Sequence, residues 1–164
     1  MLILASNSPR RKELLSMLGY EFVVKASDCD ESTDITEPAE LVKELSLRKA
    51  KAVKVGAEDT VIGSDTVVAI NGKILGKPVD ENDAAEMLKM LSNKTHTVYT
   101  GVTVIQNDMQ ITEVISCDVT FKKMTETEIL NYIKTKSLWI KPARMPYKAK
   151  ARLLLKSLTE ITLQ

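Results

Sequence analysis

The sequence predicts one α/β domain built on a mixed, twisted β-sheet flanked by helices. Short apolar runs rich in Val and Ile alternate with segments whose apolar residues recur at helical spacing, which is the pattern of this class. Two hairpin turns, at Asn71-Gly72 and Asn107-Asp108, join neighbouring strands directly, so part of the sheet is antiparallel. The 164 residues contain no internal repeat and no low-complexity linker, so 1–164 is treated as a single domain.

The composition excludes several classes of protein. A hydrophobic content of 44% and a charged content of 27% are ordinary for a soluble globular domain. The net charge of +1 gives no general attraction to nucleic acids or membranes, so an anion site requires a local cluster of cations. No apolar run is long enough to span a bilayer. Cys29 and Cys117 lack metal-type spacing and indicate free thiols in a reducing, cytoplasmic environment.

The first strand leads directly into a polar loop and a helix. Residues 1–5 are apolar, Ser8 is a suitable N-cap, Pro9 suits the first helical position, and Gly19 closes the helix. Two arginines, Arg10 and Arg11, fall in the first turn, where the helix dipole disfavours cations. This conflict favours an anion bound at the helix start. Two solvated arginines are the alternative.

An acidic loop and a second helix follow a strand over residues 21–26. Asp28, Asp30 and Glu31 in the loop could hold a hard cation such as Mg²⁺, or could simply be solvated. The second helix starts at residues 36–38. Lys49 lies at the edge of its apolar stripe.

The most apolar run, residues 60–70, predicts a buried strand with Asp65 at its centre. A buried Asp needs a charge partner, a metal or a raised pKa. Gly63 before it allows a close backbone approach or a bulge. The Asn71-Gly72 turn and a return strand over residues 73–75 bring Lys77 back, so we predict a Lys77–Asp65 pair.

The remaining elements complete the sheet. Asp80 caps a helix that runs to about residue 91, and residues 96–106 and 110–121 form a second hairpin. His96 is the only histidine, and we expect it to make a structural hydrogen bond because no nucleophile motif accompanies it. Residues 125–133 predict a short capped helix.

Together, a helix start that binds anions, two lysines, an acidic loop and a strand-borne Asp suit phosphoryl chemistry on a nucleotide. The chain has no P-loop and no GxGxxG motif, which argues against kinases and dinucleotide enzymes.

The chain resembles the Maf nucleotide pyrophosphatases in six ordered motifs. They are Ala5-Ser6-Asn7-Ser8-Pro9-Arg10-Arg11, Asp30-Glu31, the run 45–50 ending in Lys49-Ala50, Gly63-Ser64-Asp65-Thr66-Val67-Val68, Gly76-Lys77-Pro78, and Thr95-His96-Thr97-Val98-Tyr99-Thr100-Gly101-Val102. The resemblance covers residues 1–135. It implies hydrolysis of a nucleoside triphosphate to the monophosphate and pyrophosphate, with Mg²⁺ or Mn²⁺. It also implies an inosine-triphosphatase-like fold with a central cleft between two lobes.

The resemblance also assigns the site. Asp65 becomes the proton acceptor, while Arg10 and Thr66 match positions linked to base choice, in the form typical of the branch acting on dTTP and UTP. We expect Glu31 and Asp65 to be the metal ligands. The expected substrate-binding residues are Ser8, Arg10, Arg11, Lys49, Thr66 and Lys77.

The resemblance breaks near the C-terminus. The family has a segment of the form Glu-Pro-Met-Asp-Lys-Ala-Gly-Ala-Tyr-Ala-Ile-Gln-Gly, whereas this chain reads differently over residues 137–149. Joining the third base of each codon to the first two of the next makes Trp139 into Ile140 read as Asp, and Met145 into Pro146 read as Ala. The other junctions permit the family order. We therefore interpret 137–149 as the family segment in a shifted frame, with 159–164 also anomalous.

This interpretation predicts impaired activity and an irregular segment 137–149. The rival hypothesis is a catalytically silent nucleotide-binding or regulatory protein of cell division. The sequence is compatible with a homodimer, gives no strong nucleic-acid signal, and leaves the oligomeric state open.

Overall fold

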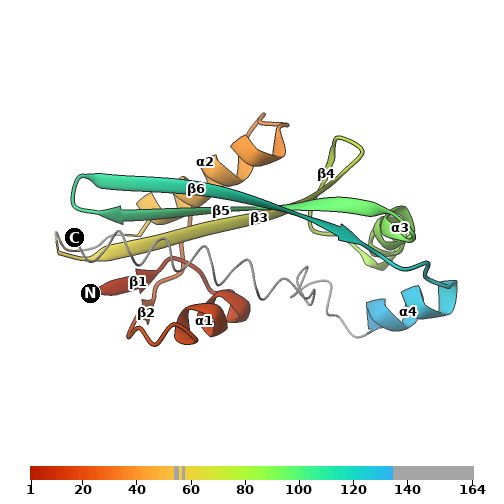
Figure 1. Ribbon diagram of the computed structural model, residues 1–164, viewed down its shortest axis with the longest axis horizontal. Coiled ribbons are helices and arrows are strands. Elements are labelled where there is room, and N and C mark those ends of the chain that lie inside the picture. The colour runs from red at the N-terminus through yellow and green to blue at the C-terminus, as the bar shows by residue number, and fades with distance from the viewer. Residues whose placement is uncertain (54–55, 57, 135–164) are drawn as a thin grey trace.

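The computed structural model (Figure 1) describes residues 1–53, 56 and 58–134. The predictions for residues 137–149 and 159–164 concern residues outside this described part of the chain. The elements are β1 (Leu2–Leu4), α1 (Pro9–Ser16), β2 (Val23–Val24), α2 (Pro38–Lys51), β3 (Thr60–Ile70), β4 (Lys73–Leu75), α3 (Glu81–Leu91), β5 (Thr95–Gln106), β6 (Met109–Thr120) and α4 (Glu126–Lys134).

All strands of the described part form one six-stranded sheet in the order β2-β1-β3-β5-β6, with β4 also paired to β3. The β2–β1 and β1–β3 pairs are parallel, whereas β3 pairs antiparallel with both β4 and β5, and β5 with β6. The mixed α/β class is therefore confirmed. Figure 1 shows α2 on one side of the long strands and α1 on the other.

The hairpin turns form as predicted. Asn71 and Gly72 have φ values of 51° and 73°, which the two-residue turn between β3 and β4 requires and which glycine and asparagine tolerate best. Asn107 has a φ of 53° at the turn between β5 and β6. Both turns hold their strands in one-to-one register.

Most boundaries differ from the predicted ones by one residue, and two elements are clearly shorter than predicted. Helix α1 ends at Ser16, before Gly19, and the second strand shrinks to β2. Ser8 occupies the N-cap position of α1, but its side chain makes no capping hydrogen bond. Asp80 does cap α3, since its Oδ1 accepts a 2.8 Å hydrogen bond from the Asp83 amide.

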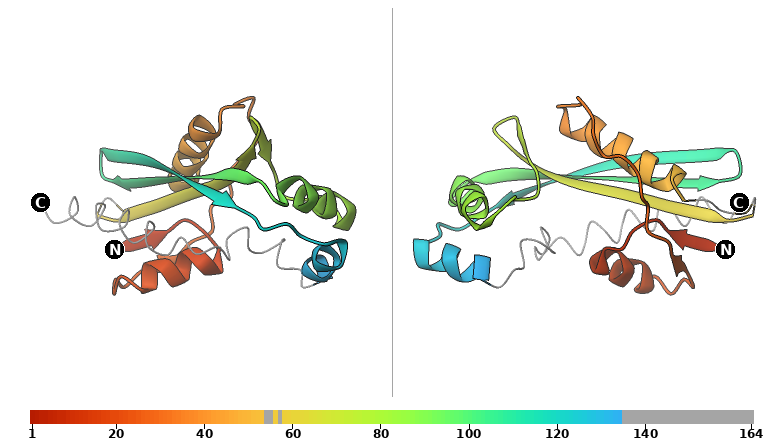
Figure 2. Two further views of the ribbon diagram at one scale, coloured as in Figure 1. Left: turned by 45° about the vertical axis from the view of Figure 1, so that its right-hand side comes forward. Right: turned by 180° about the vertical axis from the view of Figure 1, so that it is seen from behind.

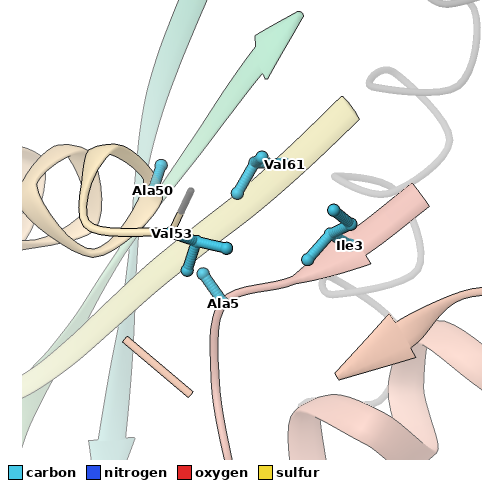
Figure 3. Packing of buried hydrophobic residues seen from close by; sticks show 5 residues of the cluster. All are labelled: Ile3, Ala5, Ala50, Val53 and Val61. Carbon is cyan, nitrogen blue, oxygen red and sulfur yellow. The ribbon is translucent and has the colours of Figure 1, made fainter. Parts of the chain in front are cut away.

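The buried apolar side chains gather at two ends of the long strands. One cluster joins β1, the end of α2 and the start of β3, and Figure 3 shows its members Ile3, Ala5, Ala50, Val53 and Val61. A second group joins α3 and α4 with the far end of β3; its clusters contain Ala84, Leu88, Ile129 and Ile133, and Ile70, Leu75 and Leu91. The two views of Figure 2 show these two lobes bridged by β3, β5 and β6. No helix in the described residues is long and apolar enough to cross a membrane.

His96 lies in the second lobe, where its ring meets Phe121 edge-on with centroids 4.8 Å apart. The residue is 2% exposed, and neither ring nitrogen has a hydrogen-bond partner among the described residues. The expected structural hydrogen bond is therefore not found in that part of the chain. Burial lowers the pKa of the His96 imidazole, because the charged form loses its hydration.

This burial predicts acid sensitivity. Since the folded pKa of His96 lies below its usual 6.5, the unfolded chain binds more protons, and stability is complete above about pH 6.5 and falls at lower pH. The slope reaches at most about 1.4 kcal/mol per pH unit. Denaturant unfolding between pH 7 and pH 5 measures it.

The control is His96→Leu, which removes the only histidine of the chain. This variant should lose the pH dependence in that range. Equal pH dependence in both proteins would contradict a buried neutral His96.

Candidate active site

A buried ion pair forms the centre of the site. Asp65 comes from the middle of β3 and Lys49 from the last turn of α2, and the Lys49 Nζ lies 2.5 Å from the Asp65 Oδ1. Both residues are almost fully buried, at 8% and 9% exposure. Because removing a charge from water is costly, each of these residues depends on the other.

Glu31 is the second carboxylate on the same ammonium. Its Oε1 lies 3.0 Å from the Lys49 Nζ, and its side chain is about half exposed. Glu31 belongs to the loop between β2 and α2. The Nζ of Lys49 in α2 therefore contacts one carboxylate from this loop and one from β3. The nearby Asp30 is used differently, since its Oδ1 accepts hydrogen bonds from the amide and hydroxyl of Ser32.

The contact of α2 with the sheet explains why Lys49 reaches Asp65. A Cβ atom at Gly63 would lie 2.3 Å from the Ser46 carbonyl oxygen, and one at Gly101 would lie 2.2 Å from the Val42 carbonyl oxygen. The helix backbone therefore rests directly on β3 and β5 at these glycines. Gly63 serves the close approach expected from the sequence. The unbroken one-to-one pairing of β3 with β5 excludes a bulge there.

Arg11 adds a second cation beside the two carboxylates. Its Nη1 donates a 3.1 Å hydrogen bond to the Ser6 Oγ, which also accepts from the Ser8 amide at 3.2 Å. Burial lowers the pKa of the Arg11 guanidinium, and the charges of Asp65 and Glu31 oppose that effect. The loop after β1 thus fixes Arg11 through Ser6 at a place where the charges of both carboxylates act on its guanidinium.

The middle of β3 has a ladder partner on one edge only among the described residues. On the other edge, β1 pairs with residues 60–62 and β4 pairs with residues 68–70. Within the described part of the chain, neither of these strands pairs with residues 63–67, the interval that contains Asp65.

The predicted Lys77–Asp65 pair is wrong. Lys49 takes that place, while Lys77 is exposed and makes no ion pair with any described residue. The β3–β4 ladder ends where Leu75 pairs with Val68, so the register does not hold Lys77 opposite Asp65.

Thr66 lies on the face of β3 opposite to Asp65, because successive side chains of a regular strand alternate. Its Oγ1 lies 3.1 Å from the Oγ1 of Thr100, its partner on β5. The structure thus brings Asp65, Lys49, Glu31 and Arg11 together but places Thr66 across the strand.

Arg10 and Ser8 lie half-buried at the start of α1. Sequence reasoning gave no separate role to Ser6, which is 7% exposed and anchors Arg11. Its position between an apolar strand and a helix cap was the available signal.

Cys29 lies close enough to Lys49 and Glu31 to feel their charges, and nothing in the sequence linked these residues. Burial raises the pKa of its thiol; the Lys49 charge acts in the opposite direction. Both Cys29 and Cys117 are free, as expected.

Comparison with known proteins identifies the family. The family model described as "Maf-like protein" matches residues 1–150. The chain belongs to this family. A Bacillus cereus protein named dTTP/UTP pyrophosphatase is 46% identical over 137 residues, which is 82% of this chain and 68% of that protein.

A Bacillus thuringiensis protein of the same name is 45% identical over 137 residues, which is 82% of this chain and 72% of that protein. Among solved structures, a HAM1 protein from Coxiella burnetii has a TM-score of 0.49 and 13% identity, covering 71% of this chain and 70% of that chain.

The close contact at Gly63 generates a prediction. Gly63→Ala forces a Cβ against the Ser46 carbonyl and the Ala50 amide, so the free energy of unfolding should fall by about 3 kcal/mol or more. Gly76→Ala is the matched control, because a Cβ there meets nothing within 4 Å. It should change stability by less than about 0.5 kcal/mol. Chemical denaturation of both variants measures the difference, and equal effects would contradict the seating of α2.

Proposed function

We propose that this chain hydrolyses nucleoside triphosphates, dTTP and UTP in particular, to the monophosphate and pyrophosphate. The observation that carries the proposal is the buried Lys49–Asp65 pair, with Glu31 on the same ammonium and the charge of Arg11 close by. The names of the Bacillus relatives supply the substrate class. Their activity and this arrangement of charges agree, because a carboxylate and several cations are what triphosphate hydrolysis requires.

Asp65 acts as the general base. Water attacks the α-phosphorus, its proton passes to the Asp65 carboxylate, and the bond from the α-phosphorus to the bridging oxygen breaks to release pyrophosphate. Lys49 holds the carboxylate in place and, together with Arg11, offsets the charge that develops on the phosphoryl oxygens.

The start of α1 binds the phosphates. Its first amides carry the positive end of the helix dipole, and Ser8, Arg10 and Arg11 lie in the loop and first turn. Lys77 is proposed as a further phosphate ligand. It is exposed and lies two residues after the end of β4, from where it would reach the substrate.

A divalent cation fits the donor set. Glu31 and Asp65 converge on one ammonium, each with a second oxygen, and Mg²⁺ is usually held by one or two carboxylates together with substrate phosphates. No cluster of three or more His, Cys, Asp or Glu side chains occurs in the described residues, so the substrate would have to complete the coordination. Mg²⁺ or Mn²⁺ bound by Glu31 and Asp65 would neutralise phosphate charge.

Base choice is assigned to Arg10 and Thr66. Thr66 faces away from Asp65, so a nucleotide lying along residues 63–67 of β3 would meet the carboxylate on one side of the strand and the Thr66 hydroxyl on the other. Thr100 fixes the Thr66 hydroxyl through their 3.1 Å contact.

Replacement of the base tests the mechanism. Asp65→Asn should lower kcat by roughly 10²–10⁴, the usual contribution of a general base, while nucleotide binding is largely kept. Pyrophosphate release from dTTP and UTP is the assay, with Asp108→Asn at an exposed turn as the control. An unchanged rate would remove Asp65 from the mechanism, and binding without release in the parent chain would favour a silent nucleotide-binding protein.

Replacement of Arg11 tests the phosphate site. Arg11→Ala should weaken the binding of a triphosphate by roughly ten- to a hundredfold, because a charge-assisted contact is lost, and should barely change the binding of the nucleoside. Lys12→Ala, one residue further along α1, is the control. Calorimetric titration measures both, and equal loss for triphosphate and nucleoside would place the phosphates elsewhere.

The altered sequence over residues 137–149 is proposed to impair this chain. Restoring the Asp-Lys-Ala-Gly-Ala-Tyr-Ala-Ile-Gln-Gly frame should raise pyrophosphate release at least roughly tenfold, the effect expected when a binding contact is recovered. Resequencing the gene is the accompanying observation. An intact frame that encodes the present residues, with full activity, would refute the proposal.

A further inference from the structure

Three hydroxyl groups form a buried chain between α2 and the sheet. The Ser46 Oγ lies 2.9 Å from the Thr103 Oγ1, which lies 2.9 Å from the Thr112 Oγ1. Ser46 and Thr103 are both 0% exposed. This chain of hydroxyl groups runs from Ser46 in α2 to Thr103 in β5 and on to Thr112 in β6. Thr103 and Thr112 are partners in the β5–β6 ladder.

The direction of this chain follows from counting protons. The Ser46 hydroxyl donates to the Lys43 carbonyl oxygen at 2.9 Å, because a carbonyl can only accept. A hydroxyl has one proton, so Ser46 must accept from Thr103, and Thr103 must in turn accept from Thr112. Hydrogen-bond donation therefore runs from Thr112 to Thr103 to Ser46, and the last acceptor is the main-chain carbonyl of Lys43 in α2.

This chain supplies the directional part of the contact between α2 and the sheet. Helices normally interlock through side-chain ridges, but Gly63 and Gly101 present none beneath the helix backbone. Apolar contact alone is non-directional and leaves a helix free to shift along a smooth surface. A hydrogen bond of 2.9 Å is lost when its atoms separate by about 1 Å, so the hydroxyl chain resists such a shift.

The same strand positions carry the site. Thr103 pairs with Gly63, and Gly101 pairs with Asp65, so the residues beneath the helix and the catalytic carboxylate lie two positions apart in the β3–β5 ladder, on the same face of the sheet. Lys49 follows Ser46 by three residues and therefore projects from the same helix face. A shift of α2 would move the Lys49 ammonium away from Asp65.

We propose that the hydroxyl chain from Thr112 through Thr103 to Ser46 is a positioning device that fixes α2 along the sheet and so holds the Lys49 ammonium on Asp65 and Glu31. Its effect on turnover rests on the proposed function, but its effect on the position of Lys49 does not. Thr103 and Ser46 are accordingly positioning residues, and they act through Lys49.

Lysine acetylation read by mass spectrometry tests the position of Lys49 directly. Lys49 should react slowly, since it is buried and paired, whereas Lys43 and Lys51 on the same helix are exposed and serve as internal references. Thr103→Val keeps the shape of the side chain and removes the hydroxyl. It removes the hydrogen bonds with both Ser46 and Thr112 and should raise the acetylation rate of Lys49 by roughly three- to tenfold relative to Lys43 and Lys51, because the link between α2 and the sheet is lost.

Three further variants make the result specific. Thr103→Ser keeps the hydroxyl and should restore slow labelling. Ser46→Ala should behave as Thr103→Val does, and it places the best helix former in α2, so folding is retained. Thr95→Val removes an exposed hydroxyl pair with Thr120 at 2.7 Å between the same two strands, at the far end of β5, and should leave Lys49 unchanged.

The outcomes separate the proposal from a general loss of structure. Faster labelling of Lys49 alone in Thr103→Val and Ser46→Ala supports it. Unchanged labelling of Lys49 in both variants, or equal acceleration of Lys43, Lys49 and Lys51, overturns it. The acetylation rates do not depend on whether the chain hydrolyses nucleotides. Absence of pyrophosphate release would contradict the proposed function and leave the result on the position of Lys49 unaffected.

The rate of pyrophosphate release provides a second test in every form of the protein that shows this activity. Thr103→Val should lower kcat by roughly three- to tenfold, and Thr103→Ser should recover it. In a Lys49→Met background the Thr103→Val change should have no further effect on nucleotide affinity or kcat, because the residue through which it acts is gone. An equal factor in both backgrounds would show that Thr103 acts independently of Lys49 and would overturn the proposal.

Discussion

The buried ion pair between Lys49 and Asp65 exists because a helix backbone lies directly on two strands. Desolvating two charges is costly, and only close geometry with additional partners compensates for it. The glycines beneath α2 provide the close approach, and Glu31 and Arg11 provide the additional partners. The two cations and two carboxylates balance, so the buried Lys49–Asp65 pair belongs to a group of charges without a net charge.

That balance has a consequence for the substrate. A triphosphate brings several negative charges into a cluster that is already neutral, and further cations must compensate for them. In the proposed reaction, Arg10 and the amides at the start of α1 would supply part of this charge. Glu31 and Asp65 would hold a divalent cation, which would supply the rest.

The strand β3 connects this chemistry with the rest of the fold. It belongs to the first core cluster at Val61 and to the second at Ile70, so both lobes are anchored on one element. Between these ends its outer edge has no ladder partner in the described residues. Asp65 lies in that interval, at the place where the chain passes from one lobe to the other.

The features that depend on neighbouring residues in the sequence were predictable from it. The apolar run around Asp65, the Asn71-Gly72 turn and the Asp80 cap each express preferences of neighbouring residues, and all three formed. The partner of Asp65 was not predictable in this way. It depends on where a helix crosses the sheet, and the glycines that decide the crossing could equally have marked a bulge.

The pairing error at Lys77 has the same origin. A hairpin turn fixes which residues face each other, but the β4 ladder stops at Leu75, and beyond that point the register no longer constrains the side chain. The helical pattern placed Lys49 at the edge of an apolar stripe, and the family resemblance added substrate binding, but neither indicated a pair with Asp65. Its role required the contact with β3, which joins residues far apart in sequence.

The charged cluster draws its described partners from distant parts of the sequence. Ser6 and Arg11 come from the loop and helix after β1, Glu31 from the next loop, Lys49 from α2 and Asp65 from β3, while Thr103 and Thr112 support α2 from β5 and β6. The Lys49–Asp65 pair is thus formed by residues that precede the altered sequence at 137–149. A comparison of this chain with its frame-restored form therefore leaves the residues of the pair unchanged.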